Sequence, residues 1–242
     1  MDNEVNIPDE TESKSIADYY HMLKKCLIND CPYEVKHLLD ESLMFPIFKA
    51  VFLKMLNEHS KLKSKRYCQK GSGVYDPLYL DHYLILCYRF SHRLYKSGYE
   101  DLAKVVYYSS RIRCSVDIFY KTEIDSYFIP VHPFGTVISP YAKYGKGLVL
   151  YHNVLIGHYY DNAPSEKLKR PIIGDGVRIY SNAKVMGASN IGNNVTISMG
   201  TQVIDRQIPD NSKVLTAPNG RLIILKNERD NFSSLFVNSN KE

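Results

Sequence analysis

Three histidines lie close together in the second half of this 242-residue chain, at positions 132, 152 and 158. Histidine is the usual general base near neutral pH, because the pKa of its side chain lies close to that value. His152 is the leading candidate for such a base, and His132 is a second candidate for a catalytic or orienting role. Each of them also fits an ordinary turn or surface position. The surrounding repeat decides how these side chains are placed.

An aliphatic or aromatic residue returns every six positions on both sides of these histidines. A helix would repeat near 3.6 residues and a half-buried strand at 2, so a period of six fits neither. It is typical of a parallel β-helix, in which short strands are joined by tight turns and one side chain per hexad points inward. A slip of one residue would bury polar groups. The inward positions are Ile138, Tyr144, Leu150, Ile156, Ile173, Ile179, Val185, Ile191, Ile197 and Val203.

The six-residue period breaks in the segment 158–170, which is polar and contains Pro164. We expect a loop that protrudes from one corner of the coil, as insertions in solenoids do. It also fits a tolerated surface loop. A functional role is favoured because His152 and His158 lie at its base, so the loop is predicted to line the binding face.

The first half of the chain is predicted to be helical. Apolar spacing predicts helices over 17–30, 42–65, 75–98 and 100–114, and in the third Asp76 is the expected N-cap, Pro77 the first helical residue and Gly98 the stop. The predicted division is a disordered lead-in over 1–15, a helical domain over 16–120, a β-helix domain over 121–226 and a C-terminal tail over 227–242. The fold class is therefore mainly β with a helical N-terminal part.

Composition excludes several classes of function. The net charge is only +5, with no dense stripe of Lys and Arg, which argues against nucleic-acid binding. No apolar run is long enough to span a bilayer, and the acidic N-terminus is not a secretory signal. The five cysteines are irregularly spaced, so neither a disulfide framework nor a metal site is expected. We expect a cytoplasmic protein.

Three stretches of the sequence resemble one known family. They are Tyr88-Arg-Phe-Ser-His-Arg-Leu-Tyr95 after Asp76-Pro77, the coil from Ile138 to Asn153, and the closing stretch from Ile208 to Ile224. Together they resemble the serine acetyltransferase branch of the hexapeptide-repeat acyltransferases over about residues 75–225. The resemblance implies a left-handed, three-sided coil, a trimer or larger assembly, and acetyl-CoA bound in the groove between neighbouring coils.

The resemblance also implies roles for individual residues. His152 matches the catalytic histidine, whereas Val137, Tyr151 and Arg170 stand where the family has an orienting aspartate, a substrate-binding aspartate and a second substrate-binding histidine. Serine is therefore not the expected acceptor, and a backbone carbonyl, Asp125 or Asp161 would have to orient His152. The acceptor contacts are expected from Tyr151, His158, Tyr159 and Arg170.

Some non-serine relatives keep a His-Pro-x-Gly-Thr pattern, which supports a role for His132. If Val131 lies one coil before Leu150, His132 and His152 lie on adjacent coils about 4.8 Å apart and share one site. For acetyl-CoA, backbone contacts are expected near Ser181, Met199, Gly187 and Gly200. Arg221 and Lys226 are candidate cations for its 3′-phosphate.

The predicted function is an acetyl-CoA-dependent O-acetyltransferase that acts on a hydroxyl of a sugar or of a surface polysaccharide, such as capsule or lipopolysaccharide. One alternative is serine O-acetyltransferase itself. A second is a zinc enzyme that resembles β-helix carbonic anhydrases, with His132, His152 and His158 as ligands. A third is a non-catalytic binding scaffold. The sequence leaves open which hydroxyl is acetylated.

Overall fold

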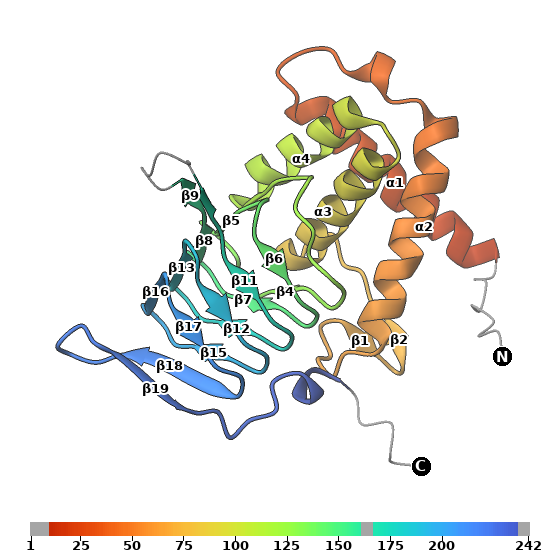
Figure 1. The fold of residues 1–242 in the computed structure, drawn as a ribbon. Helices are drawn as coiled ribbons and strands as arrows, with labels where there is room; N and C mark the ends of the chain where they lie inside the picture. Colours follow the sequence, from red (N-terminus) through yellow and green to blue (C-terminus); the bar gives the residue numbers. More distant parts are fainter. Residues whose placement is uncertain (1–9, 161–166, 237–242) are drawn as a thin grey trace.

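The computed structural model describes residues 10–160 and 167–236 (Figure 1). Its first half contains four α-helices and one short 3-10 helix. The elements are α1 (Glu10–Asp30), η1 (Lys36–Leu38), α2 (Glu41–Ser60), α3 (Leu80–Lys96) and α4 (Glu100–Cys114). Among these described helices, none is both long and apolar enough to cross a membrane. All five cysteines lie in this half and are free.

The helix boundaries differ from the prediction in three places. Helix α1 begins at Glu10, so it includes part of the expected disordered lead-in, and residues 1–9 lie outside the described chain. Helix α2 ends at Ser60, and a small hairpin of β1 (Cys68–Gln69) and β2 (Ser72–Gly73) follows. Helix α3 begins at Leu80. The Asp76 carboxylate instead accepts a hydrogen bond from the Leu78 amide at 2.9 Å, which fixes a turn before the helix.

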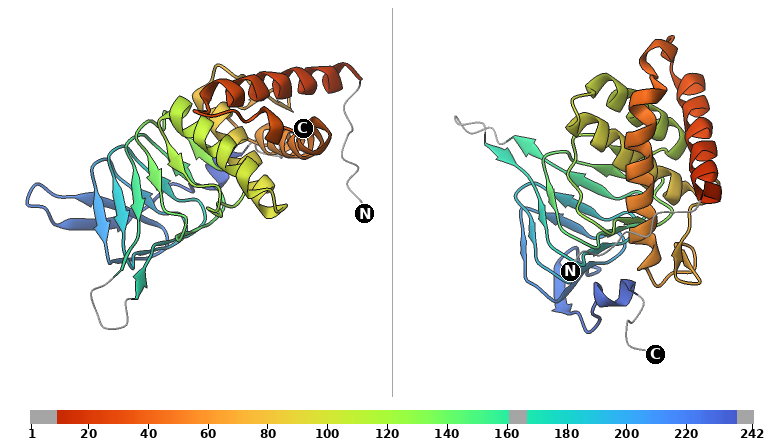
Figure 2. Two further views of the ribbon diagram at one scale, coloured as in Figure 1. Left: turned by 90° about the horizontal axis from the view of Figure 1, so that it is seen from above. Right: turned by 90° about the vertical axis from the view of Figure 1, so that its right-hand side faces the viewer.

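Helix α3 lies at the centre of the helical part and is buried on almost every side. Aromatic rings of the neighbouring helices fill the core around it, and Phe48 of α2 meets Phe90 of α3 edge to face at 5.5 Å. Gly98 follows α3 with a φ of +87°, a conformation that glycine adopts without steric cost. This turn returns the chain as α4, which packs along α3 (Figure 2).

The second half is a parallel β-solenoid, as the hexad pattern predicts, and it has three sides, as the family resemblance implies. Its strands form three sheets, in the orders β17-β14-β11-β6, β19-β18-β15-β12-β7-β4 and β16-β13-β8-β5-β3. The strands are β3 (Asp117–Ile118), β4 (Ile129–Pro130), β5 (Val137–Ile138), β6 (Lys143–Tyr144), β7 (Val149–Leu150), β8 (Leu155–Gly157), β11 (Ile172–Ile173), β12 (Arg178–Ile179), β13 (Lys184–Met186), β14 (Asn190–Ile191), β15 (Thr196–Ile197), β16 (Gln202–Ile204), β17 (Gln207–Ile208), β18 (Ser212–Thr216) and β19 (Leu222–Lys226).

The register of the solenoid follows the predicted hexads. Ile179 of β12 pairs with Leu150 on the preceding coil and with Ile197 on the next, and all three side chains are fully buried. Equivalent residues on these later coils are 18 apart, which is three hexads. Across the insertion the step is 29 residues. The extra residues include β9 (Tyr159–Tyr160) and β10 (Leu168–Lys169), which pair antiparallel; 161–166 lie outside the described chain.

Both ends of the solenoid are covered. The helices lie over the first coils, and the antiparallel hairpin of β18 and β19 closes the other end (Figures 1 and 2). The segment after β19 is more than a tail. It runs back along the sheet that contains β12, forms the 3-10 helix η2 (Ser233–Leu235), and buries Asn231 against the coil. The Asn231 amide donates to the Thr196 hydroxyl at 3.0 Å.

Candidate active site

His152 lies at the corner between the sheet that contains β7 and the sheet that contains β8. Its Nδ1 lies 3.3 Å from the hydroxyl of Ser181, which occupies the same corner on the next coil. The backbone carbonyl of His152 accepts a hydrogen bond from the Asn182 amide at 3.1 Å. The imidazole is partly exposed. The corner therefore presents a partly exposed imidazole whose Nδ1 faces the Ser181 hydroxyl, and no hydrogen bond of its Nε2 is found among the described residues.

In the described residues, Nδ1 of His152 has the Ser181 hydroxyl as its partner, a group that the sequence did not suggest for this role. The carboxylate of Asp125 accepts hydrogen bonds from the backbone and hydroxyl of Ser126, on a different sheet, and Asp161 lies outside the described residues. Val137 has a side chain that is 42% exposed and offers no hydrogen bond. The Ser181 hydroxyl, predicted only as a cofactor contact, takes the position of the orienting group.

His132 and Tyr151 line a cavity of about 370 Å³ that does not include His152. Strand pairing places Pro130 beside Leu150, so the assumption that Val131 takes this position is wrong. The segment that joins β4 to β5 is longer than the corresponding segments of the later coils. Within it, His132 turns the chain with a φ of +46°. In the described chain, no hydrogen bond or ring contact joins the two imidazoles. His132 and His152 each follow the paired residues Pro130 and Leu150 by two positions, so they lie on adjacent coils, and a site shared between them stays a prediction.

His158 lies in a separate groove beside α4. Its Nδ1 is 2.8 Å from the hydroxyl of buried Ser139, and its ring packs edge to face on Tyr141 at 4.6 Å. The same groove is lined by Val137 and Met186. Arg170 reaches the same residue, since its guanidinium donates to the Tyr141 carbonyl at 3.4 Å, whereas the hydroxyl of Tyr159 donates to Asp205.

The residues predicted to hold acetyl-CoA lie along the later coils. Met199 is 71% exposed at the corner that also holds Ser181, and Gly187 and Gly200 have φ values of +64° and +71°. Arg221 lines a cavity of about 610 Å³ beside the closing hairpin. Lys226 instead forms a surface ion pair with Glu228 at 3.3 Å. In the described parts of the chain, Arg221 forms no ion pair, and its role toward the 3′-phosphate stays a prediction.

The zinc alternative needs His132, His152 and His158 around one ion. Among residues 10–160 and 167–236 no group of three His, Cys, Asp or Glu side chains is placed to hold a metal ion. The geometry therefore gives no support to that alternative.

Two arginines in the 370 Å³ cavity were not predicted from the sequence. Arg178 of β12 occupies the position before inward Ile179, where the repeat predicts an exposed side chain, yet it is only 8% exposed. The segment after β19 covers it and brings Arg229 into the same cavity. No local pattern signals this contact, because it joins parts of the chain more than fifty residues apart.

The known proteins to which this chain is similar include serine acetyltransferases. No family model matches the chain. The serine acetyltransferase of Bacillus pumilus is 30% identical over 148 residues, which is 61% of this chain and 65% of that protein. The serine acetyltransferase of Bacillus subtilis is 30% identical over 141 residues, which is 58% of this chain and 62% of that protein. The matched region thus spans less than two thirds of each relative.

Solved structures share the fold over most of the chain. A Neisseria gonorrhoeae serine acetyltransferase in complex with serine has a TM-score of 0.62 at 22% identity and covers 92% of this chain and 100% of that one. A Vibrio cholerae serine acetyltransferase has a TM-score of 0.63 at 18% identity and covers 93% and 91%. The chain therefore has the fold of these hexapeptide-repeat proteins. In sequence and architecture it is serine acetyltransferase-like.

These comparisons contradict the predicted sugar or polysaccharide acceptor. The relatives and structures named above are serine acetyltransferases, which favours the alternative of serine O-acetyltransferase. The prediction failed because it relied on Val137, Tyr151 and Arg170. Their side chains show which of the family's contacts this chain lacks, but a missing contact does not identify another acceptor.

Proposed function

We propose that this protein transfers an acetyl group from acetyl-CoA to the hydroxyl of L-serine. The observation that carries the proposal is the His152–Ser181 pair at an exposed corner of a serine acetyltransferase-like solenoid. Acyl transfer to a hydroxyl needs a base near neutral pKa beside a surface that can align an extended thioester. The corner offers an imidazole beside an exposed edge of the coils.

In the proposed reaction, Nε2 of His152 removes the proton of the serine hydroxyl as its oxygen attacks the thioester carbonyl. Acetyl-CoA, when bound, supplies that carbonyl and the sulfur leaving group. The imidazolium then returns the proton to the departing sulfur, so the products are O-acetylserine and the free thiol of coenzyme A. The Ser181 hydroxyl holds the ring in position throughout these steps.

The contacts to the acceptor must differ from those that the family resemblance implies. Tyr151 stacks on Tyr180 with ring centroids 4.7 Å apart, so it packs on the coil surface and offers no carboxylate for an amino group. We therefore expect the Michaelis constant for serine to be high. Assembly as a trimer or larger complex, with the thioester between neighbouring coils, is part of the same proposal.

The direct test is serine-dependent release of free thiol from acetyl-CoA, with O-acetylserine identified by mass spectrometry. The His152→Ala variant should lower kcat by about a hundredfold or more, with acetyl-CoA affinity near normal, because only the proton transfer is lost. Absence of O-acetylserine at saturating serine would contradict the proposed acceptor. An unchanged rate in the variant would exclude His152 as the base.

A further inference from the structure

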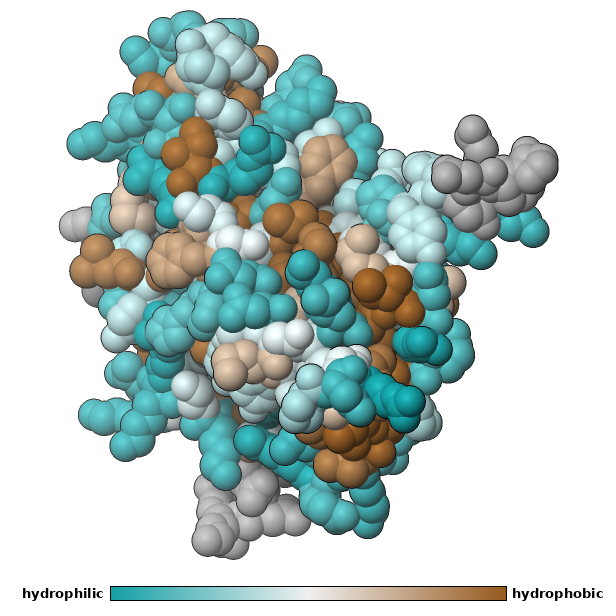
Figure 3. Space-filling view, turned by 90° about the vertical axis from the view of Figure 1, so that its left-hand side faces the viewer, coloured by the Kyte–Doolittle hydropathy of each residue, from teal (hydrophilic) through white to brown (hydrophobic). Residues whose placement is uncertain are grey.

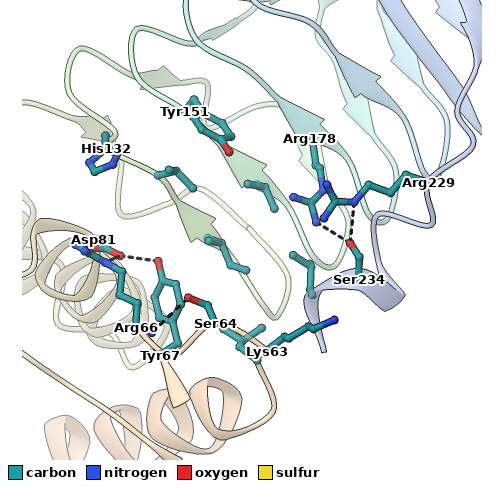
Figure 4. A pocket seen from close by; sticks show the side chains of 15 residues that line it. Lys63, Ser64, Arg66, Tyr67, Asp81, His132, Tyr151, Arg178, Arg229 and Ser234 are labelled. Atoms are coloured by element: carbon teal, nitrogen blue, oxygen red, sulfur yellow. Dashed lines mark hydrogen bonds and ion pairs between the residues drawn. The ribbon is translucent and has the colours of Figure 1, made fainter. Parts of the chain in front are cut away.

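The 370 Å³ cavity, here called the basic cavity, lies between the loop 62–67, the outer face of β4, β7 and β12, and the segment 229–235 (Figure 4). Its walls combine apolar side chains such as Ile129, Val149 and Leu235 with several cationic ones. A concave, mostly apolar site with a few convergent polar groups is the usual form of a small-molecule site. The basic cavity therefore has the form of a small-molecule binding site.

Arg178 is the central cation of the basic cavity. Its Nη2 donates to the Asn231 carbonyl at 3.2 Å and to the Ser234 hydroxyl at 2.9 Å, while its Nε is buried and has no partner. More than nine tenths of the residue is buried. A buried charged donor without an acceptor is unfavourable. The arrangement is therefore incomplete without a further acceptor.

A second guanidinium group converges on the same place. Nε of Arg229 donates to the Ser234 hydroxyl at 3.3 Å, so both arginines meet at one oxygen. Burial, and then the charge of Arg229, lower the pKa of Arg178. Two like charges are thus held together, which is unfavourable unless a negative charge lies between them.

The carboxylate in the wall of the cavity does not neutralise this pair. Asp81 accepts hydrogen bonds from Nε of Arg66 at 2.7 Å and from the Tyr67 hydroxyl at 2.6 Å. In the described parts of the chain, no acidic side chain forms an ion pair with Arg178, Arg229 or the exposed Lys63. The basic cavity therefore carries an excess of positive charge at one end and an apolar wall at the other.

We propose that the basic cavity binds the oxyanion group, phosphate or carboxylate, of a small organic metabolite. Arg178 and Arg229 hold the oxyanion, because guanidinium groups match its geometry with paired N–H donors. The apolar part of the metabolite rests on Ile129, Val149 and Leu235. His152 and Ser181 do not line the basic cavity, although Tyr151 in its wall directly precedes His152, so we place the oxyanion site next to the proposed acceptor site and not within it.

Calorimetric titration of the full chain with phenyl phosphate, benzoate, inorganic phosphate and phenol tests this proposal. The organic anions should bind and phenol should not, and the stronger of the two identifies the preferred oxyanion. The Arg229→Gln variant should weaken that binding about tenfold or more. Arg229 is exposed, so the variant should fold normally. Arg93→Gln removes the same charge from the exposed face of α3 and should leave binding unchanged.

The binding measurement does not depend on the proposed activity. Failure of both organic anions to bind, equal binding of phenol, or equal weakening by Arg93→Gln would overturn the oxyanion site. Saturating serine should leave the dissociation constant of phenyl phosphate unchanged, and His152→Ala should bind it normally. Competition with serine would show that the basic cavity is the acceptor pocket, and would overturn a separate site.

Discussion

At the scale of single residues, the site depends on one hydrogen bond. Nδ1 of His152 has the Ser181 hydroxyl as its partner, where the family resemblance implies a carboxylate. A hydroxyl can fix the tautomer and orientation of an imidazole, but it stabilises the imidazolium less than a negative charge does. We therefore expect orientation to be the main contribution of Ser181.

Ser181→Ala tests this positioning role. The substitution should lower kcat about tenfold while the Michaelis constant for acetyl-CoA stays unchanged, because the variant loses alignment of the base and not a cofactor contact. Ser198→Ala removes a hydroxyl one coil further along, at the position equivalent to Tyr180, and should leave both constants unchanged. Steady-state kinetics with varied acetyl-CoA measures kcat and the Michaelis constant separately. A raised Michaelis constant with normal kcat would instead assign Ser181 to cofactor binding.

At the scale of elements, helix α3 carries an unusual set of buried polar side chains. The ring of His82 lies 5.2 Å from that of His59 and 5.0 Å from that of Tyr67, and its Nδ1 accepts a hydrogen bond from the Asp76 amide at 3.0 Å. The imidazole is fully buried. Burial lowers the pKa of His82 from 6.5 to about 4, and it lowers the pKa of His59 and His92 in the same direction.

The depressed pKa of His82 predicts a fold that loses stability in mild acid. Between pH 6.5 and pH 4 the unfolded chain binds a proton at His82 that the folded chain does not. The free energy of unfolding is therefore complete above pH 6.5 and falls as the pH approaches 4, by up to about 3 kcal/mol. Urea unfolding followed by circular dichroism at several pH values measures this slope.

A pair of variants isolates this contribution. His82→Asn retains an acceptor for the Asp76 amide but does not titrate, so it should flatten the slope between pH 6.5 and pH 4. His21→Asn replaces a histidine whose side chain is 57% exposed and should leave the slope unchanged. An identical slope in wild type and His82→Asn would assign the acid sensitivity to other groups.

At the scale of the whole molecule, the outer face of the solenoid carries exposed apolar side chains among its polar ones. Val137, Met199 and Ile204 are exposed on or next to the sheet that contains β5 and β16. Figure 3 views the molecule from the side on which this sheet lies in Figure 1, and hydrophobic patches are visible between polar side chains. Exposed apolar patches of this kind mark contact surfaces. They are consistent with the proposed assembly of solenoids.

We expect sedimentation analysis to give a mass of at least three times the 27.9 kDa chain. Ile204→Asp places a charge on the exposed face of the solenoid and should shift the protein toward the monomer, because burying an unpaired carboxylate is unfavourable. Ile112→Asp adds the same charge on α4, at a residue that is 49% exposed, and should leave a trimer or larger species. A monomeric wild type at micromolar concentration would contradict the assembly.

Much of this fold could be predicted because the solenoid is a local repeat. Each hexad places one side chain inward, so the pattern predicts Leu150, Ile179 and Ile197 as inward residues. The observed strand register pairs these residues on successive coils. The helical part was less predictable at its ends. Asp76 forms a turn where the sequence suggested a cap, since a short acidic side chain suits either structure.

The amino-acid sequence by itself determined the parallel solenoid, the helical first half and the position of His152 two residues after inward Leu150. It did so because strand period and helix spacing are properties of neighbouring residues. Only the tertiary structure placed Ser181 against His152 and folded the segment 229–235 over Arg178. Those contacts join residues from different coils and from the end of the chain. Their geometry depends on how the coils stack, so local sequence patterns do not predict it.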